Sequence, residues 1–192
     1  MLRRIIVSLF LLSGATRISA QAPEIPRPDT LGANFDHSSP GKGTPVDYDF
    51  LVGKWTFRYQ QRDPVSGSYG PVLTGQWSGE KTHETLLADQ FLLVNRAGVT
   101  HATATYRVLN PQRGVWEIQG VAVRRGVWQP GISWSDGSDR FLVQHNPETN
   151  TTLRIRYYAI THGRFLWRAD GSRDGGKSWL RDVILIEATR VQ

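Results

Sequence analysis

Residues 47–59 read DYDFLVGKWTFRY and contain the clearest secondary-structure pattern in the chain. Aromatic residues stand at every other position of its second half, at Trp55, Phe57 and Tyr59, and polar or basic residues stand between them. A period of two is typical of a β-strand that buries one face. The stretch therefore predicts a strand over Lys54–Tyr59 that opens a folded domain near residue 48.

Similar alternation recurs along the rest of the chain, and we expect about ten strands. They are predicted at Lys54–Tyr59, Val72–Gly79, His83–Leu87, Gln90–Ala97, Thr100–Leu109, Val115–Val123, Arg140–Gln144, Thr152–Ile160, Arg164–Ala169 and Trp179–Thr189. No stretch of about twelve residues or more shows a sustained helical period. The chain is therefore predicted to be all-β.

Short turn signals such as Asn110-Pro111 and Asn146-Pro147 separate the predicted strands. Gly126–Asp139, rich in Gly and Ser and containing Pro130, is predicted to be a longer loop with at most a short strand around Trp134. Connections this short leave no room for helical crossovers, so neighbouring strands should be antiparallel. Both a sandwich and a closed meander barrel satisfy this pattern.

The N-terminus has the pattern of an export signal. Arg3 and Arg4 precede an apolar run over Ile5–Leu12, and small residues lead to Ala20, after which we expect cleavage. The run is too short to span a bilayer, and no long apolar stretch follows it. The pattern predicts a signal peptide over 1–20, export by the Sec or twin-arginine route, and a periplasmic or extracellular protein without an integral membrane segment.

A proline-rich stretch over 21–47 follows and is predicted to be a flexible lead-in, which leaves 48–192 as the domain. The formal charge of +6 includes three arginines of the signal, and without them 20 basic residues face 17 acidic ones. This modest excess does not favour a nucleic-acid partner. The absence of cysteine excludes disulfides, thiolate metal sites, cysteine nucleophiles and a lipidated cysteine. No histidine spacing indicates a metal site.

Motifs at the two ends of the predicted domain resemble those of a known family of barrels. Gly53-Lys54-Trp55 is a G-x-W motif, and the last predicted strand is followed by Arg190. This pairing resembles the lipocalin or calycin barrels, and with the turn at Asn110-Pro111 and the DGGKSW sequence at 174–179 the domain resembles a family of bacterial lipocalin-like domains of unknown function. The resemblance implies an antiparallel up-and-down barrel of about 8–10 strands with a cavity. It also implies that Gly53, Trp55 and Arg190 are structural.

The SRDGGKSW segment at 172–179 also fits an Asp-box turn. In such a turn Asp174 accepts backbone hydrogen bonds, Gly176 takes a positive φ and Trp179 packs beneath. Sialidase-type propellers carry several such boxes, but this chain has one. The three residues are therefore predicted to be structural.

Aromatic faces are expected to point into the barrel because burial of each large apolar side chain stabilises the fold by about 1.5–3 kcal/mol. The residues expected to line the cavity are Phe57, Tyr59, Tyr106, Glu117, Phe141, His145, Tyr157 and Trp167. Within this set Glu117 is a polar anchor if its face is interior, and a solvated residue if that face meets water. The opposite faces, including that of His101 and Arg107, are expected to meet solvent. The same is expected of Arg154, Arg156, Arg164 and Arg168, since burying unpaired arginines is costly.

These features predict reversible binding of a small apolar or amphipathic molecule, without a cofactor. An alternative is a barrel filled by its own aromatics, in which the Gly126–Asp139 region with Trp128 and Trp134 is a protein-interaction surface. A third is a cofactor-free isomerase or cyclase that uses Glu117 and His145, or a haem binder that uses His145. Haem barrels of the nitrobindin kind place the ligand near the C-terminus, where residues 179–192 contain no histidine. The sequence does not indicate the oligomeric state.

Overall fold

The computed structural model describes residues 24–26, 40–95 and 98–192. The predicted signal peptide lies outside the described residues. One short 3-10 turn, η1, precedes ten strands. Their bounds are η1 Asp49–Leu51, β1 Gly53–Gln61, β2 Leu73–His83, β3 Leu86–Asn95, β4 Gly98–Asn110, β5 Val115–Ala122, β6 Val127–Asp136, β7 Asp139–Asn146, β8 Thr151–Tyr158, β9 Arg164–Ser172 and β10 Leu180–Arg190.

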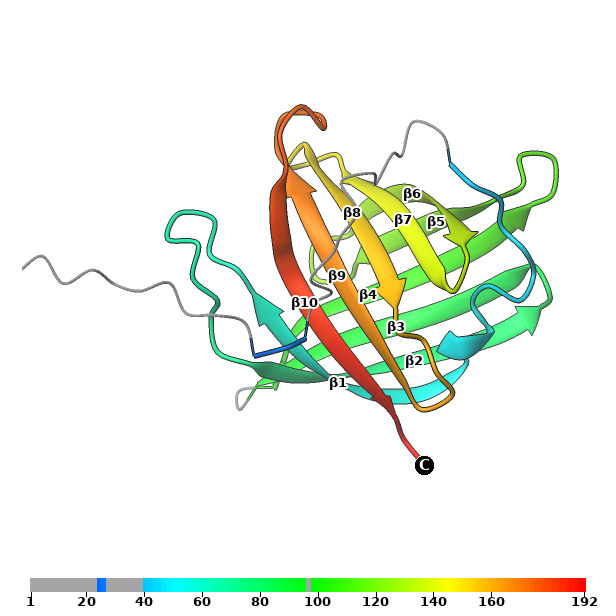
Figure 1. Cartoon of the computed structure of the whole chain (residues 1–192), viewed down its shortest axis with the longest axis horizontal. Helices are drawn as coiled ribbons and strands as arrows, with labels where there is room; N and C mark the ends of the chain where they lie inside the picture. The colour runs from blue at the N-terminus through cyan, green and yellow to red at the C-terminus, as the bar shows by residue number, and fades with distance from the viewer. Residues whose placement is uncertain (1–23, 27–39, 96–97) are drawn as a thin grey trace, which may run out of the picture.

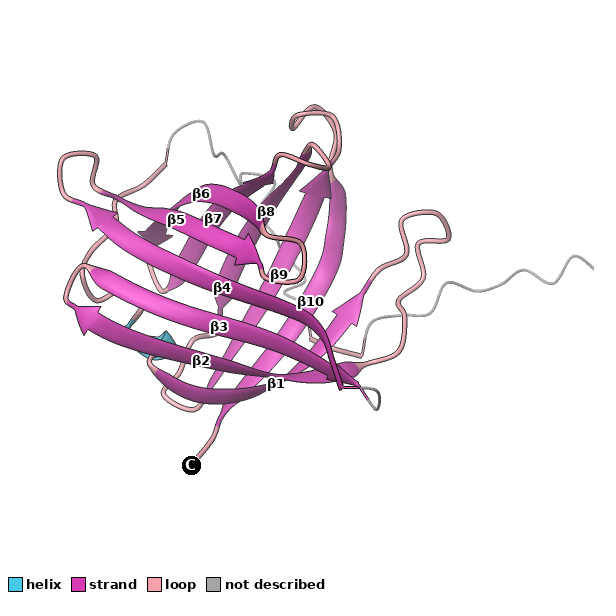
Figure 2. Ribbon diagram, turned by 180° about the vertical axis from the view of Figure 1, so that it is seen from behind, coloured by secondary structure: helices cyan, strands magenta, loops and turns pink. Residues whose placement is uncertain are grey.

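The strands form a closed barrel in which each pairs antiparallel with its sequence neighbours (Figures 1 and 2). Pairing of β1 with β10, from Trp55 opposite Arg190 to Gln61 opposite Ile184, closes the sheet. The all-β, antiparallel up-and-down barrel is thus confirmed, and the sandwich is excluded. Among the residues described, no helix has the length and apolar character to cross a bilayer.

Two strand predictions differ from the structure. The predicted strands over His83–Leu87 and Gln90–Ala97 are replaced by β3, after a turn at residues 84–85. The predicted loop over Gly126–Asp139 is wrong, since most of it is β6, which pairs with β5 and β7. Gly131 pairs with Gln144 in this strand, and an added Cβ there would lie 2.5 Å from the Val143 carbonyl oxygen. Its glycine marks a close backbone approach, not a turn.

Aromatic side chains fill one end of the barrel, which we call the closed end. Trp55, Trp116, Tyr157 and Phe165 are all buried there, and Trp55 lies edge-on to Phe165 at 4.9 Å. Burial of such rings dominates core energetics, and edge-to-face geometry adds to it. Because the described chain contains no cysteine, these contacts and the strand ladder hold the barrel together.

The G-x-W motif and Arg190 meet at the closed end. The Arg190 guanidinium lies 4.3 Å from the centre of a Trp55 ring and donates to the carbonyl oxygens of Val52 (2.7 Å), Phe50 (3.0 Å) and His162 (2.7 Å). Gly53 adopts φ +108°, and a Cβ there would lie 2.7 Å from the guanidinium. The three residues thus join η1, β1 and β10 through stacking and hydrogen bonds.

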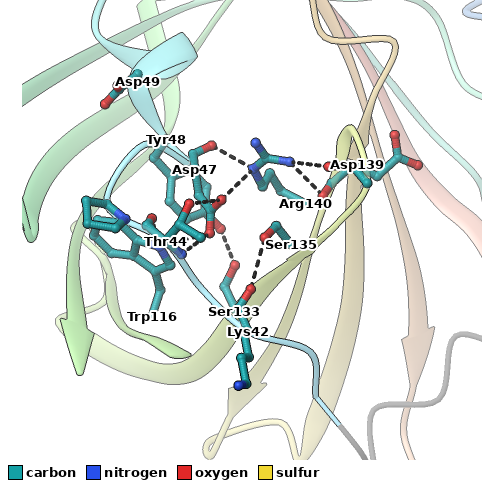
Figure 3. Close-up of polar contacts among 12 residues, drawn as sticks. Lys42, Thr44, Asp47, Tyr48, Asp49, Trp116, Ser133, Ser135, Asp139 and Arg140 are labelled. Atoms are coloured by element: carbon teal, nitrogen blue, oxygen red, sulfur yellow. Dashed lines mark hydrogen bonds and ion pairs between the residues drawn. The ribbon is translucent and has the colours of Figure 1, made fainter. Parts of the chain in front are cut away.

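Some described residues of the 21–47 lead-in contact the barrel, although most of residues 40–46 are exposed. Residues 40–48, which we call the strap, lie against the closed end, where Asp47 accepts hydrogen bonds from the Thr44 amide (2.8 Å) and Trp116 Nε1 (3.3 Å) (Figure 3). Arg140 Nε donates to the Asp47 carbonyl oxygen at 2.8 Å. On the outer wall, Ile25 is buried against Tyr69 and Leu185. The barrel domain therefore includes contacts from before residue 48.

Candidate ligand-binding cavity

The other end of the barrel holds a cavity of about 870 Å³. Its outermost lining residues come from the strand ends farthest from η1, among them Gln61, Asn146, Leu153 and Ile184. We call this the open end. The volume lies in the range of small-molecule sites in proteins.

About half of the residues that line the cavity are apolar, and the rest are polar or charged. Phe91, Leu142, Ile155 and Trp167 contribute to the wall from four different strands. Phe91 stacks on Phe57 with ring centres 4.4 Å apart and nearly parallel planes, which holds its ring in place. Offset stacking of this kind stabilises aromatic pairs beyond their burial. The wall therefore offers a preformed apolar surface.

The floor of the cavity is polar and buried. Arg107 Nε donates to Asp89 Oδ2 at 2.7 Å, and the two side chains are only 2% and 1% exposed. Trp77 Nε1 donates to Asp89 Oδ1 at 2.9 Å, and Arg107 Nη2 donates to the Tyr157 hydroxyl at 3.3 Å. We call these four residues the floor network. All four line the cavity, so a bound molecule would meet them at its inner end.

Burial controls the protonation of the floor. It raises the pKa of Tyr157, against the opposing effect of Arg107, so the phenol stays protonated at neutral pH. For Arg107, burial disfavours the charge, but Asp89, Tyr157 and Tyr48 together outweigh burial and the pKa of the guanidinium is raised. The floor is therefore a neutral ion pair with a neutral tyrosine beside it.

Two arginines of the β5–β6 turn lie at the open end. Arg124 and Arg125 line the cavity there, and Arg124 Nη1 donates to the carbonyl oxygens of Val99 and Thr100, both at 3.3 Å. Partial burial and the nearby Arg125 charge lower the pKa of His101, which also lines the cavity. At neutral pH the positive charge here comes from the arginines.

The structure brings four of the eight predicted lining residues into the barrel interior. Tyr59, Tyr157 and Trp167 line the cavity, and Phe57 lies in the core behind Phe91. Burial raises the pKa of Tyr59 to about 12, and its hydroxyl donates to Gln61 Oε1 at 3.0 Å. These four residues lie on β1, β8 and β9, where the aromatic face is the interior face.

The other four lie on the outer wall, which corrects the expected placement. Tyr106 is 52% exposed, Glu117 forms an exposed ion pair with Arg113, Phe141 stacks on Trp134, and His145 hydrogen-bonds Thr152. The reason is strand alternation, since their neighbours along each strand are the residues that face inward. His145 is therefore not placed to ligate haem in the cavity, and neither His145 nor Glu117 faces a molecule bound there.

The floor network was missed because its face on β4 was expected to meet solvent. The pattern grouped His101, Thr103, Thr105 and Arg107 correctly, and all four line the cavity. An interior arginine is tolerable only when a partner neutralises it. That partner, Asp89, is 18 residues away on the neighbouring strand, and no local spacing connects the two.

The four arginines expected on the outside do lie on the outer wall, and each has a carboxylate partner. Arg154 and Arg168 pair with Asp170, at 3.1 and 2.8 Å, and Arg156 pairs with Asp139. Arg164 pairs with Glu187 at 2.7 Å. Arg168 is nonetheless buried, so a side chain on the outer wall of the barrel is not always exposed to solvent.

The Asp-box residues form the turn between β9 and β10. Asp174 accepts hydrogen bonds from the Ser178 amide (2.9 Å) and the Ser172 hydroxyl (2.8 Å), and Gly176 adopts φ +89°. The Trp179 ring packs beneath the Arg154 guanidinium at 4.2 Å. Within the described ranges, no cluster of three or more His, Asp or Glu side chains could hold a metal ion.

Comparison with solved structures places the barrel among known folds. It is similar to Rv2717c from M. tuberculosis, with a TM-score of 0.59 and 14% identity over 79% of this chain and all of that one. It is also similar to the S-type phycobiliprotein lyase CPES from Guillardia theta, with a TM-score of 0.53 and 11% identity over 76% of this chain and 90% of that one. The chain has a lipocalin-like barrel fold. No family model and no curated protein matches it.

Proposed function

We propose that this protein reversibly binds a small amphipathic molecule inside its barrel. The observation that carries the proposal is the cavity of about 870 Å³, open at one end, with a partly apolar wall and a polar floor. Concave, mostly apolar sites with a few convergent polar groups are the usual form of small-molecule sites. The barrel aromatics fill the closed end and leave the open end hollow, which favours binding over a purely solid barrel.

The wall and the floor together favour an amphipathic ligand. The apolar part of the wall gains from burial of hydrocarbon at roughly 25 cal/mol per Å². The floor network would be left with poorly satisfied polar groups under a purely apolar molecule. A ligand that has a polar group at its inner end matches both.

Titration with the neutral fluorophore N-phenyl-1-naphthylamine tests the proposal. Saturable enhancement of its emission is expected for the wild type and a loss of at least tenfold in affinity for Thr103→Trp, which fills part of the cavity. Thr74→Trp is the matched control, because Thr74 is exposed on the outer face of β2. Absence of saturable binding, or equal binding by all three proteins, would overturn the proposal.

We also propose that binding takes place outside the cytoplasm, on the basis of the N-terminal sequence pattern. Expression of the full chain in a bacterial host with two membranes tests this. The intact mass of protein released by osmotic shock should match a chain that begins at Gln21. Retention of the full-length chain in the cytoplasm contradicts it.

A further inference from the structure

The floor network has more hydrogen-bond donors than acceptors. Its donors are the indole N–H of Trp77, the guanidinium of Arg107 and the hydroxyl of Tyr157, and its acceptors are the Asp89 carboxylate and the Tyr157 oxygen. Arg107 Nη1 is buried and has no hydrogen-bond partner within the described part of the chain. A buried donor without an acceptor costs stability, so an acceptor brought by a ligand would be favoured there.

The charge balance of the floor selects the kind of acceptor. Asp89 neutralises Arg107 in a buried pair at 2.7 Å, and the phenol of Tyr157 is neutral. Tyr48, whose ring centre lies 4.6 Å from the guanidinium carbon, is held neutral by burial as well. A second anion at this depth would be buried without a counter-charge of its own. A neutral acceptor, such as a carbonyl oxygen, fits the floor.

The open end favours a negatively charged group, whereas the floor favours a neutral one. Neither Arg124 nor Arg125 forms an ion pair with any carboxylate in residues 24–26, 40–95 and 98–192; Arg124 instead donates to two backbone carbonyl oxygens. Their uncompensated positive charge at the entrance attracts and holds a negative group. From His101 at the entrance to Arg107 at the floor, β4 advances roughly 20 Å.

We propose that the cavity binds an elongated anionic amphiphile in one orientation. Its neutral carbonyl-type acceptor lies at the floor against Arg107 and Tyr157, and its negative group lies at the entrance against Arg124 and Arg125. This inference rests on the proposed function, because it assigns the polarity of the ligand that the cavity takes. It adds that a molecule with the reverse polarity, its anion at the floor, is disfavoured.

Two matched pairs of fluorophores test the two ends separately. Prodan, a naphthalene with a carbonyl acceptor, is compared with N,N-dimethyl-2-naphthylamine, which lacks the carbonyl. 1-Anilinonaphthalene-8-sulfonate is compared with N-phenyl-1-naphthylamine, which lacks the sulfonate. The wild type is expected to prefer the first member of each pair, by roughly tenfold for the carbonyl and by several-fold, decreasing with added salt, for the sulfonate.

Variants assign each preference to its residues. Tyr157→Phe and the double variant Arg107→Met with Asp89→Leu, which removes the ion pair as a unit, should reduce the carbonyl preference and leave the sulfonate preference. Arg124→Gln with Arg125→Gln should do the reverse. Arg113→Gln, an exposed arginine on the β4–β5 turn, is the control and should change neither.

The outcomes separate the two proposals. If none of the four fluorophores binds, the proposed function fails. If they bind with affinities that Thr103→Trp reduces, but either preference is absent or survives removal of its residues, binding in the cavity stands and the orientation is overturned.

Discussion

At the residue scale, the buried Arg107–Asp89 pair is the most consequential contact of the interior. Breaking it from one side leaves an uncompensated charge on a side chain that is at most 2% exposed. Asp89→Asn should therefore lower the free energy of unfolding by about 3 kcal/mol, as measured by urea denaturation. The double variant Arg107→Met with Asp89→Leu should recover much of that loss, because it removes both charges.

The matched control is Glu117→Gln, which breaks the exposed ion pair between Glu117 and Arg113. Exposed pairs contribute little, so the loss should stay within about 0.5 kcal/mol. Equal losses for Asp89→Asn and Glu117→Gln would show that the floor network does not depend on charge compensation.

Asp174 is expected to make the stability of the fold depend on pH in the acidic range. Hydrogen bonds from Ser178 and Ser172 lower the pKa of its carboxyl below the ordinary 3.8. A carboxyl with a lowered folded-state pKa stabilises the fold above its unfolded pKa, and that contribution is lost as the pH falls through the folded pKa. Asp174→Asn should therefore lower Tm at pH 6, and its difference from the wild type should shrink below pH 3.8. A Tm difference that is constant from pH 6 to pH 2 would contradict this.

Single residues also show where prediction from sequence stopped. Alternation separates the two faces of a strand, but it does not say which face is interior. The rule that aromatics face inward held for Tyr59, Tyr157 and Trp167 and was wrong for Tyr106, which lies outside while Arg107 lies inside. Local composition cannot reveal this, since the exception depends on a tertiary partner, Asp89.

At the element scale, the packing of β1 against β2 requires a glycine on β2, because the Phe57 ring of β1 occupies the space of a side chain at position 75. Gly75 lies opposite Phe57, and a Cβ there would come within 2.1 Å of the Phe57 ring and 2.4 Å of the Leu92 carbonyl oxygen. Gly75→Ala should force Phe57 out of its stack on Phe91 and lower the free energy of unfolding by about 2 kcal/mol. Chemical denaturation measures the loss.

Gly163→Ala is the matched control at the β8–β9 turn. Apart from its two chain neighbours, no residue that the structure describes has a heavy atom within 4 Å of the Cβ it would introduce, and its backbone is not left-handed. Its effect should be within about 0.5 kcal/mol of zero. A loss as large as that of Gly75→Ala would mean that added bulk is not the cause.

Strands were predictable from sequence where apolar and polar side chains alternate. They were missed where pairing with neighbouring strands, and not the local sequence, determines the backbone conformation. The strands around Trp55, Tyr157 and Trp167 have strong alternation and appear as β1, β8 and β9. In β6, Pro130 and Gly131 suggest a turn, but the barrel places this segment between two strands that supply its pairing. Closure of the sheet thus overrides local propensity.

At the scale of the whole molecule, the two ends of the barrel differ in structure. Trp55, Arg190 and η1 seal one end, and the other holds the cavity. The sealed end was predictable from sequence because the G-x-W motif and the final arginine resemble those of lipocalin-type barrels, although the two lie far apart along the chain. The open end depends on side chains from many strands, so its chemistry required the assembled barrel.

The strap over residues 40–48 links the sealed end to the barrel wall, and its anchor is Asp47. This buried carboxylate joins Thr44, Trp116 and Arg140, on the strap, β5 and β7 (Figure 3). Asp47→Ala removes the carboxylate from all three partners at once. The Trp116 indole N–H then keeps only its hydrogen bond to the Thr44 carbonyl oxygen. We expect a loss of about 2–3 kcal/mol in the free energy of unfolding.

Hydrogen exchange measured by mass spectrometry locates that effect. In Asp47→Ala, amides of the strap and of η1 should exchange faster, whereas those of β3 and β4 at the open end should keep their rates, because the two ends share no contact through Asp47. Asp136→Ala, an exposed carboxylate at the end of β6, serves as the control and should leave both regions unchanged. Uniformly faster exchange over the barrel would show that the strap supports the whole fold and not one end of it.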